Sequence, residues 1–172
     1  VLDVCSYIGA WGLRAAALGA EQVVCVDSSL PALERVADNA ARNRLAERVQ
    51  GRHGDAFEVL RALREEDARF DTVLLDPPAF IKRRKDEKDG IQAYLRLNRV
   101  GMELLEPGGP LVTSSCSFHM GRDIFVRTVQ QAARRAGRTL QLLETGQQGP
   151  DHPVHPAIPE TAYLKTLFFR VL

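Results

Sequence analysis

Short apolar runs rich in β-branched residues alternate with amphipathic helical patterns along the whole chain. Seven of these runs are expected to be strands, and they cover residues 1–5, 22–27, 49–53, 72–76, 110–115, 140–144 and 163–171. Five segments between them are expected to be helices, at about residues 11–18, 30–44, 56–66, 91–105 and 122–136. This alternation predicts an α/β fold with a mostly parallel seven-stranded sheet, an antiparallel last strand and helices on both faces.

Polar residues that could bind a ligand or take part in catalysis lie where the predicted strands end. Asp27 and Asp76 are the last residues of two strands, and Asp55 follows a third almost directly. Ligands of parallel sheets bind beyond the carboxyl ends of the strands, so these acids are expected to face one site. After the first strand, the stretch "DVCSYIGAWG" offers Gly9, which lets the backbone pass close to a bound ligand. The G-x-G-x-x-G fingerprint is absent, which disfavours a nicotinamide-dependent dehydrogenase.

Three acids at successive strand ends predict a pocket for an adenosine, as found in sites for NAD and for S-adenosylmethionine. Asp27 could accept hydrogen bonds from both ribose hydroxyls, and Asp55 could meet the adenine amine while Ala56 offers its N–H to the ring. Asp27 and Asp55 could instead each cap the helix that follows. The expected cofactor-binding residues are Asp3, Ser6, Tyr7, Gly9, Asp27, Ser28, Asp55, Ala56 and Asp76.

The stretch "LLDPPAFIKRRK" ends the fourth strand abruptly. Two prolines fix φ and remove two N–H donors, which leaves carbonyls that can accept a planar amine or a flipped base. Phe80 could stack on that base, and the cationic run that starts at Lys82 and Arg83 could contact phosphates, or be a solvated loop. The expected substrate-binding residues are Pro77, Pro78, Phe80, Lys82, Arg83 and, from the 145–160 loop, His152.

Cys116 lies at the end of the fifth strand, in the polar stretch "TSSCSFHM". A thiolate there could add to carbon 6 of a pyrimidine and make carbon 5 nucleophilic toward a methyl group, while Asp76 holds the base. Cys116 and Asp76 are therefore the expected catalytic residues. Three alternatives stay open: a merely buried or polar cysteine, an amine-directed methyltransferase that acts on guanine or adenine through Asp76-Pro77-Pro78, and an inactive adenosine-binding module.

The motifs "VLDVCSYIGAWGL", "VVCVDSS", "FDTVLLDPPAF", "SSCS" and "DHPVHPAIPETAYLK" together resemble the catalytic domain of the bacterial RlmI-like methyltransferases. The resemblance implies a Rossmann-like class I methyltransferase fold, S-adenosylmethionine as cofactor and 23S ribosomal RNA as the substrate in which 5-methylcytosine is made. It also implies that Cys116 is the nucleophile, that Asp76 and Pro77 belong to the base pocket, and that Asp27 and Asp55 hold the cofactor.

Length and composition agree with one domain, residues 1–172, and give few other limits. The first strand begins at Val1, so the chain is expected to be a fragment, and the resemblance implies an upstream RNA-binding PUA domain. The net charge of +1 argues neither for nor against RNA, and a homodimer is left open. No apolar run reaches the roughly 18 residues of a membrane span.

Three cysteines without close pairing argue against a disulfide framework and favour a reducing cytoplasm. Cys25 lies inside an apolar run and is expected to be a small buried side chain. His152 and His155 are three residues apart, but no third ligand is placed to complete a metal site, so no metal is expected.

Overall fold

The predicted alternation of strands and helices is confirmed in the computed structural model, which describes residues 1–172. The strands are β1 (Leu2–Val4), β2 (Val23–Asp27), β3 (Val49–His53), β4 (Val73–Leu75), β5 (Pro110–Ser115), β6 (Leu140–Gly146) and β7 (Lys165–Val171). The helices are α1 (Ala10–Ala17), α2 (Leu30–Arg42), α3 (Ala56–Glu65), α4 (Glu87–Glu103) and α5 (Arg122–Arg135), with short 3-10 turns at Arg84–Asp86 and Pro159–Thr161.

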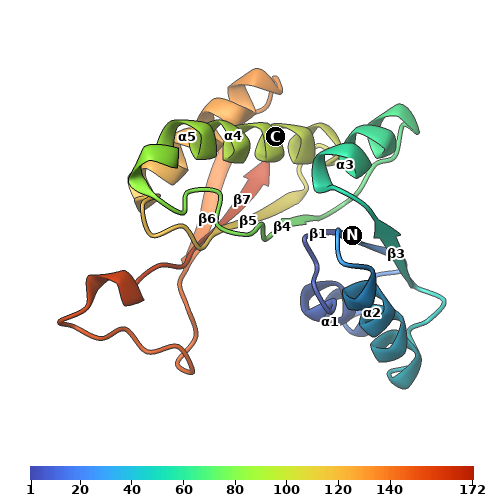
Figure 1. Ribbon diagram of the computed structural model, residues 1–172. Helices are drawn as coiled ribbons and strands as arrows, with labels where there is room; N and C mark the ends of the chain where they lie inside the picture. Colours follow the sequence, from blue (N-terminus) through green and yellow to red (C-terminus); the bar gives the residue numbers. More distant parts are fainter.

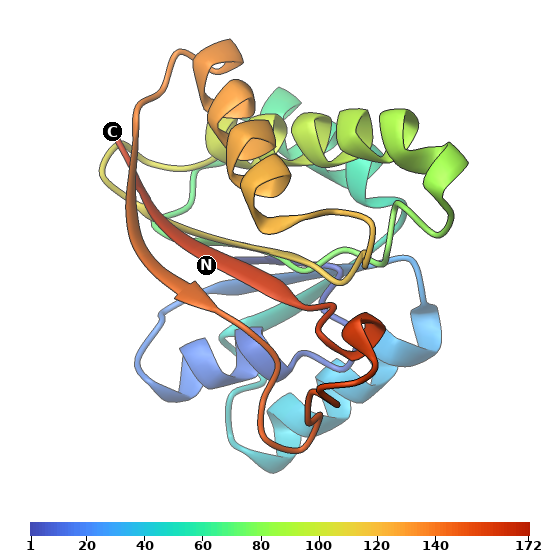
Figure 2. The same ribbon diagram turned by 90° about the vertical axis from the view of Figure 1, so that its left-hand side faces the viewer.

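All seven strands form one sheet in the order β3-β2-β1-β4-β5-β7-β6. The first five strands pair in parallel, whereas β7 inserts between β5 and β6 and runs antiparallel to both. Helices α1 and α2 cover one face, and α3, α4 and α5 cover the other (Figures 1 and 2). The predicted mixed sheet with an antiparallel last strand and two helical layers is thus confirmed.

Each face of the sheet buries its own apolar cluster. The larger cluster of 23 residues joins the sheet to α3, α4 and α5, and includes Leu2, Val4 and Leu75. The smaller cluster of 8 residues lies under α1 and α2 and includes Val36 and the fully buried Cys25, whose predicted role as a small core side chain is confirmed. Along β2 successive residues alternate between the clusters, with Val23 and Cys25 in the smaller one and Val26 in the larger one, so this strand is packed from both sides.

Helix α4 begins at Glu87, four residues before the predicted start at Ile91. Gly90 therefore lies inside the first turns of the helix, although glycine disfavours a helix interior. In the structure Gly90 serves close packing: a Cβ there would lie 2.3 Å from a side-chain carbon of Ile81. The first turn of α4 is therefore pressed against the loop that follows β4.

The segment of residues 147–164, between β6 and β7, extends away from the sheet and contains the turn Pro159–Thr161 (Figure 1). Most of its residues are exposed. No helix of the protein is both long enough and apolar enough to cross a membrane.

Candidate active site

The turn between β1 and α1 has an unusual backbone. Cys5, Tyr7 and Gly9 all have positive φ, at 62°, 50° and 81°. Positive φ is uncommon for residues other than glycine, such as Cys5 and Tyr7. The space that Gly9 leaves open is used by α2, because a Cβ at Gly9 would lie 3.1 Å from a methyl carbon of Val36. Gly9 therefore sets the turn and its packing against α2.

Asp27 links two loops at the carboxyl end of β2. Its Oδ2 accepts a hydrogen bond from the Tyr7 N–H at 2.8 Å, and its Oδ1 accepts one from the Ser29 N–H at 2.9 Å. The cap of α2 is Ser29, whose hydroxyl accepts from the Ala32 N–H, so the alternative of Asp27 as a helix cap is wrong. Each carboxylate oxygen can accept a second hydrogen bond, so Asp27 can still receive ligand hydroxyls.

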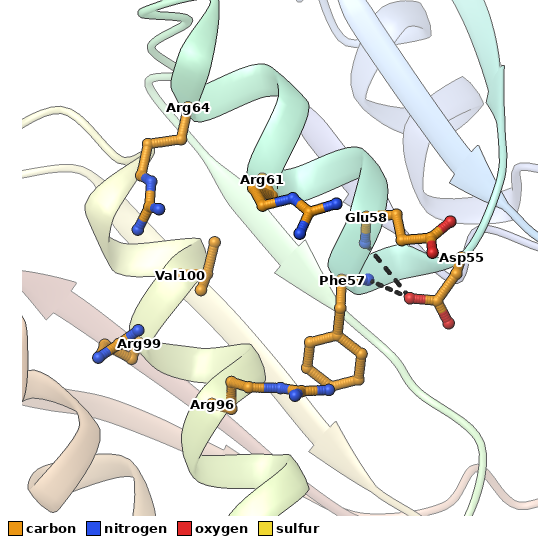
Figure 3. Close-up of a pocket in the computed structure, with 8 residues that line it drawn as sticks. All are labelled: Asp55, Phe57, Glu58, Arg61, Arg64, Arg96, Arg99 and Val100. Carbon is orange, nitrogen blue, oxygen red and sulfur yellow. Dashed lines mark hydrogen bonds between the residues drawn. The ribbon is translucent and has the colours of Figure 1, made fainter.

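Asp55 does cap the helix that follows it. Its Oδ1 accepts hydrogen bonds from the Phe57 and Glu58 N–H groups, at 2.9 and 3.3 Å. Both bonds go to the same oxygen, as the dashed lines in Figure 3 show, and Oδ2 has no protein partner. The cap and a contact to a ligand are thus compatible in one side chain.

A cavity of about 350 Å³ joins the carboxyl ends of β1, β2, β3 and β4. This volume falls in the range of small-molecule sites. The rings of Phe57 and Phe80 lie on its wall with their centroids 6.4 Å apart. The cavity is lined by Cys5, Val26, Asp27, Ser28, Gly54, Asp55, Ala56, Phe57, Asp76, Pro78 and Phe80. Five of the nine predicted cofactor residues are in this set.

The remaining predicted cofactor residues support the cavity from the turn beside it. Asp3 is fully buried, and its Oδ2 accepts the Gly12 N–H at 2.8 Å, whereas its Oδ1 has no partner. The buried Ser6 hydroxyl also lacks a partner. Burial raises the pKa of Asp3 to about 6, the Gly12 N–H opposes that rise, and the nearby charges of Asp76 and Asp27 add to it. This group of carboxyls favours a ligand that carries positive charge or several hydrogen-bond donors.

Cys116 and Asp76 meet at the ends of the neighbouring strands β5 and β4. The Cys116 Sγ lies 3.9 Å from the carbonyl oxygen of Pro77, and the side chain is half-buried. Burial raises the pKa of the Cys116 thiol, and the charge of Asp76 raises it further, whereas Lys165 lowers it. The pKa of Asp76 is itself raised by partial removal of water, against a hydrogen bond with Trp11. The thiol is therefore neutral at rest and needs help to ionise.

A buried network of hydrogen bonds holds the residues on both sides of Cys116. The Tyr94 hydroxyl, on α4, bonds to the hydroxyls of Ser115 at 3.0 Å and Ser117 at 2.9 Å. The Ser117 hydroxyl also accepts the Ile81 N–H at 3.1 Å, and the Lys165 Nζ donates to the Ser117 carbonyl at 2.6 Å. Sequence reasoning missed Tyr94 and Lys165, although a lysine inside the apolar stretch "YLKTLFF" was a signal.

The predicted substrate-binding residues are dispersed. Pro77 is buried beside Cys116, but Pro78 and Phe80 line the cavity, and Phe80 packs edge-on against Tyr94 at 4.7 Å. Three exposed residues of the set lie outside the cavity: Lys82, Arg83, which pairs with Asp86, and His152, which lies on the 147–164 segment beside Asp151.

A second cleft, of about 380 Å³, opens between α3 and α4 beside the cavity and shares Asp55 and Phe57 with it (Figure 3). It is lined by four arginines, Arg61 and Arg64 from α3 and Arg96 and Arg99 from α4. The Arg96 guanidinium lies 3.8 Å above the Phe57 ring, and Arg64 and Arg99 both pair with Glu103. Sequence reasoning missed this cleft, because each arginine alone is typical of the polar face of an amphipathic helix.

Comparisons with known proteins agree with this geometry. A model of the S-adenosylmethionine-dependent methyltransferase family matches residues 1–170. Ribosomal RNA large subunit methyltransferase I of Shewanella frigidimarina is 41% identical over 172 residues, which is 99% of this chain and 43% of that protein. The protein of the same name from Salmonella arizonae is 38% identical over 100% of this chain and 43% of its own length. The chain thus spans less than half the length of these curated relatives.

Solved structures share the fold. The crystal structure of SMU.776 complexed with SAH has a TM-score of 0.84 at 24% identity and covers 98% of this chain and 44% of its own. Trm5b from Pyrococcus abyssi has a TM-score of 0.72 at 14% identity, over 99% of this chain and 43% of its own. Because the family match extends over nearly all residues and the sheet places the acids, the cavity and the cysteine together, the chain belongs to the S-adenosylmethionine-dependent methyltransferases.

Proposed function

We propose that the chain methylates carbon 5 of a cytosine in large-subunit ribosomal RNA through a covalent adduct with Cys116. The observation that carries this proposal is the placement of Cys116 beside Asp76 and the Pro77 carbonyl, next to a cavity of nucleoside size. The printed names of the relatives from Shewanella and Salmonella support ribosomal RNA as the substrate class.

The cavity residues fit S-adenosylmethionine. Asp27 would accept the ribose hydroxyls, the free Oδ2 of Asp55 would meet the adenine amine, and Phe57 would cover the ring from the side. The carboxyls of Asp3, Asp27 and Asp76 would favour the positive charge of the sulfonium. When bound, this cofactor supplies an electrophilic methyl group.

The residues at β4 and β5 would handle the cytosine. The Cys116 sulfur would bond to carbon 6, which would place electron density on carbon 5. Carbon 5 could then take the methyl group as its bond to the sulfonium sulfur breaks and the demethylated cofactor leaves. Loss of the carbon 5 proton to a base then lets the sulfur–carbon bond break, which restores Cys116. Asp76, which directly follows β4, would hold the base by hydrogen bonding while charge develops on the ring. The Pro77 carbonyl can accept the exocyclic amine.

Transfer of a labelled methyl group from S-adenosylmethionine to unmethylated large-subunit RNA tests this function. Bisulfite conversion is expected to map 5-methylcytosine at the modified site. A methylated amine on guanine or adenine in place of 5-methylcytosine would favour the amine-directed alternative, for which Asp76-Pro77-Pro78 is the base-holding motif. Cofactor binding without any transfer would favour the inactive adenosine-binding module.

Replacing Asp27 with alanine is expected to weaken the binding of S-adenosylmethionine by about 1.5–3 kcal/mol, the range for losing hydrogen bonds to a charged group. Isothermal titration calorimetry with this compound and its demethylated product measures the loss. Asp38→Ala is the matched control, because Asp38 is an exposed acid on α2 that pairs only with Arg35. Unchanged affinity in Asp27→Ala, or tight binding of NAD in the native protein, would contradict the assignment.

The arginine cleft between α3 and α4 is the proposed contact for RNA phosphates within this chain. Arg61 has no carboxylate partner, and Arg96 exposes guanidinium edges while its face covers Phe57. Arg61→Ala with Arg96→Ala is expected to weaken RNA binding and to reduce the slope of log K against log salt by about 1 for each arginine.

Filter binding at several salt concentrations measures this slope. Arg14→Ala with Arg35→Ala removes two exposed arginines of α1 and α2 and is the matched control. Equal slopes for the two double variants would place the phosphate contacts elsewhere.

A further inference from the structure

Lys165 is a buried cation in an apolar strand. It begins β7, it is 7% exposed, and the alternate residues Leu167 and Phe169 of the same strand are core side chains. Its Nζ donates one hydrogen bond, to the Ser117 carbonyl, and it forms no ion pair with a carboxylate. A buried ammonium with so little compensation opposes folding, so its position calls for a chemical reason.

The β5–β7 pairing brings Lys165 to Cys116. Ser115 is the direct antiparallel partner of Lys165, and the Lys165 Nζ reaches the carbonyl of Ser117. Lys165 thus contacts the residues on both sides of Cys116. Because both flanking serines also bond to Tyr94, the cation and the network hold the Cys116 backbone on two sides.

The charges around this pair come from four elements. Asp76 after β4 opposes a thiolate at Cys116, whereas Lys165 on β7 favours it. Arg122 at the start of α5 opposes a second positive charge at Lys165, and Tyr94 on α4 contributes a neutral hydroxyl. Burial, with Arg122, lowers the pKa of Lys165 to about 8, although Cys116 acts in the opposite direction. Near neutral pH most of the amine therefore still carries its proton and its positive charge.

We propose that Lys165 is a positioning residue for Cys116: its ammonium holds the Ser117 carbonyl in place and stabilises the thiolate form of Cys116. The S–H bond breaks and the proton passes to water at the half-buried Cys116 side chain, while Lys165 keeps its own proton and its positive charge. Release of the methylated base returns a thiolate, which can take a proton back from water. This inference rests on the proposed function, in which the thiolate of Cys116 attacks the base.

The reactivity of Cys116 toward iodoacetamide, followed as a function of pH by peptide mass spectrometry, tests the inference. Only the thiolate is alkylated, so the rate reports ionisation. The other two cysteines interfere little, because burial raises the pKa of Cys5 and Cys25 to about 12. In Lys165→Met the rate at pH 8 is expected to fall about tenfold, with the profile displaced to higher pH, and Lys165→Arg is expected to restore most of it.

The controls separate this inference from a structural role and from the proposed function. Arg127→Met removes an exposed cation of α5 and is expected to leave the alkylation profile unchanged. If Lys165→Met does not fold, Lys165→Gln gives the same comparison. An undisplaced profile in either variant would overturn the role of Lys165. Full methylation activity in a Cys116 variant would overturn the proposed function. The alkylation profile would still test the effect of Lys165 on Cys116, because alkylation needs neither RNA nor cofactor.

Discussion

Cys116→Ala is expected to lower methyl transfer to RNA by roughly a thousandfold or more, because under the proposed function Cys116 is the nucleophile that activates carbon 5. Binding of S-adenosylmethionine should be unchanged, since Cys116 lies outside the residues that line the cavity. The measurement is the initial rate of label transfer to unmethylated ribosomal RNA, together with calorimetry of the cofactor. Cys25→Ala is the matched control, because Cys25 is a fully buried core side chain under α1 and α2.

RNA that carries 5-fluorocytosine gives this prediction a second readout. Fluorine at carbon 5 cannot leave as a proton does, so the native protein is expected to stay bonded to the RNA after methyl transfer. A band of protein linked to RNA should appear on a denaturing gel with the native protein and be absent with Cys116→Ala. Full activity of Cys116→Ala, with no trapped species, would transfer the assignment to the amine-directed alternative.

The sheet and the common location of the acids could be predicted from the sequence, because both follow from local patterns. Apolar β-branched runs of four to six residues are typical of strands buried on both faces, and Leu2, Val4 and Leu75 are indeed fully or almost fully buried. Parallel strands meet a ligand at their carboxyl ends, so Asp27, Asp55 and Asp76 were expected together, and all three line one cavity. Their individual contacts to a cofactor stay predictions.

The network around Cys116 could not be predicted, because it joins residues that lie far apart in the sequence. Tyr94 and Ser117 are 23 residues apart, and Ser117 and Lys165 are 48 apart. Their contact depends on the antiparallel register of β5 and β7, which no local pattern encodes. Tyr94 belongs to the apolar face of α4, where a tyrosine is usually a core residue, and only its hydroxyl partners distinguish it here.

The position of the Phe80 ring in the 76–81 loop could not be predicted from the sequence either. Phe80 was expected to stack on a base, and it lies on the wall of the cavity against Tyr94 and opposite Phe57. Its contact with a base stays a prediction. The turn direction after Pro78 decides which site this ring joins. The next residue, Ile81, packs closely against Gly90 in the following helix, and no local pattern encodes this contact.

Because of Lys165, the free energy of unfolding is expected to rise with pH between about 8 and 10.5. The Lys165→Met variant is expected to lack this rise. The pKa of Lys165 is lowered from 10.5 in the unfolded chain to about 8 in the folded protein. Between these values the unfolded state binds more protons, so the free energy of unfolding increases with pH. Below pH 8 both states carry the proton, and the buried ammonium costs about 3 kcal/mol relative to a neutral amine. Above pH 10.5 both states are neutral and this cost is absent.

Urea unfolding at pH 7, 8, 9 and 10 measures the effect, in a Cys116→Ser background so that no thiolate changes the amine. The advantage of Lys165→Met over Lys165 is expected to be largest at pH 7 and to fall toward zero, by about 3 kcal/mol in total, as the pH approaches 10.5. Subtracting the two curves removes the titration of all other groups, because only residue 165 differs. Parallel curves across this range would show that the folded protein leaves the pKa of Lys165 unchanged. A residue that weakens the fold at neutral pH, yet increases the reactivity of Cys116, is one whose burial serves the reaction.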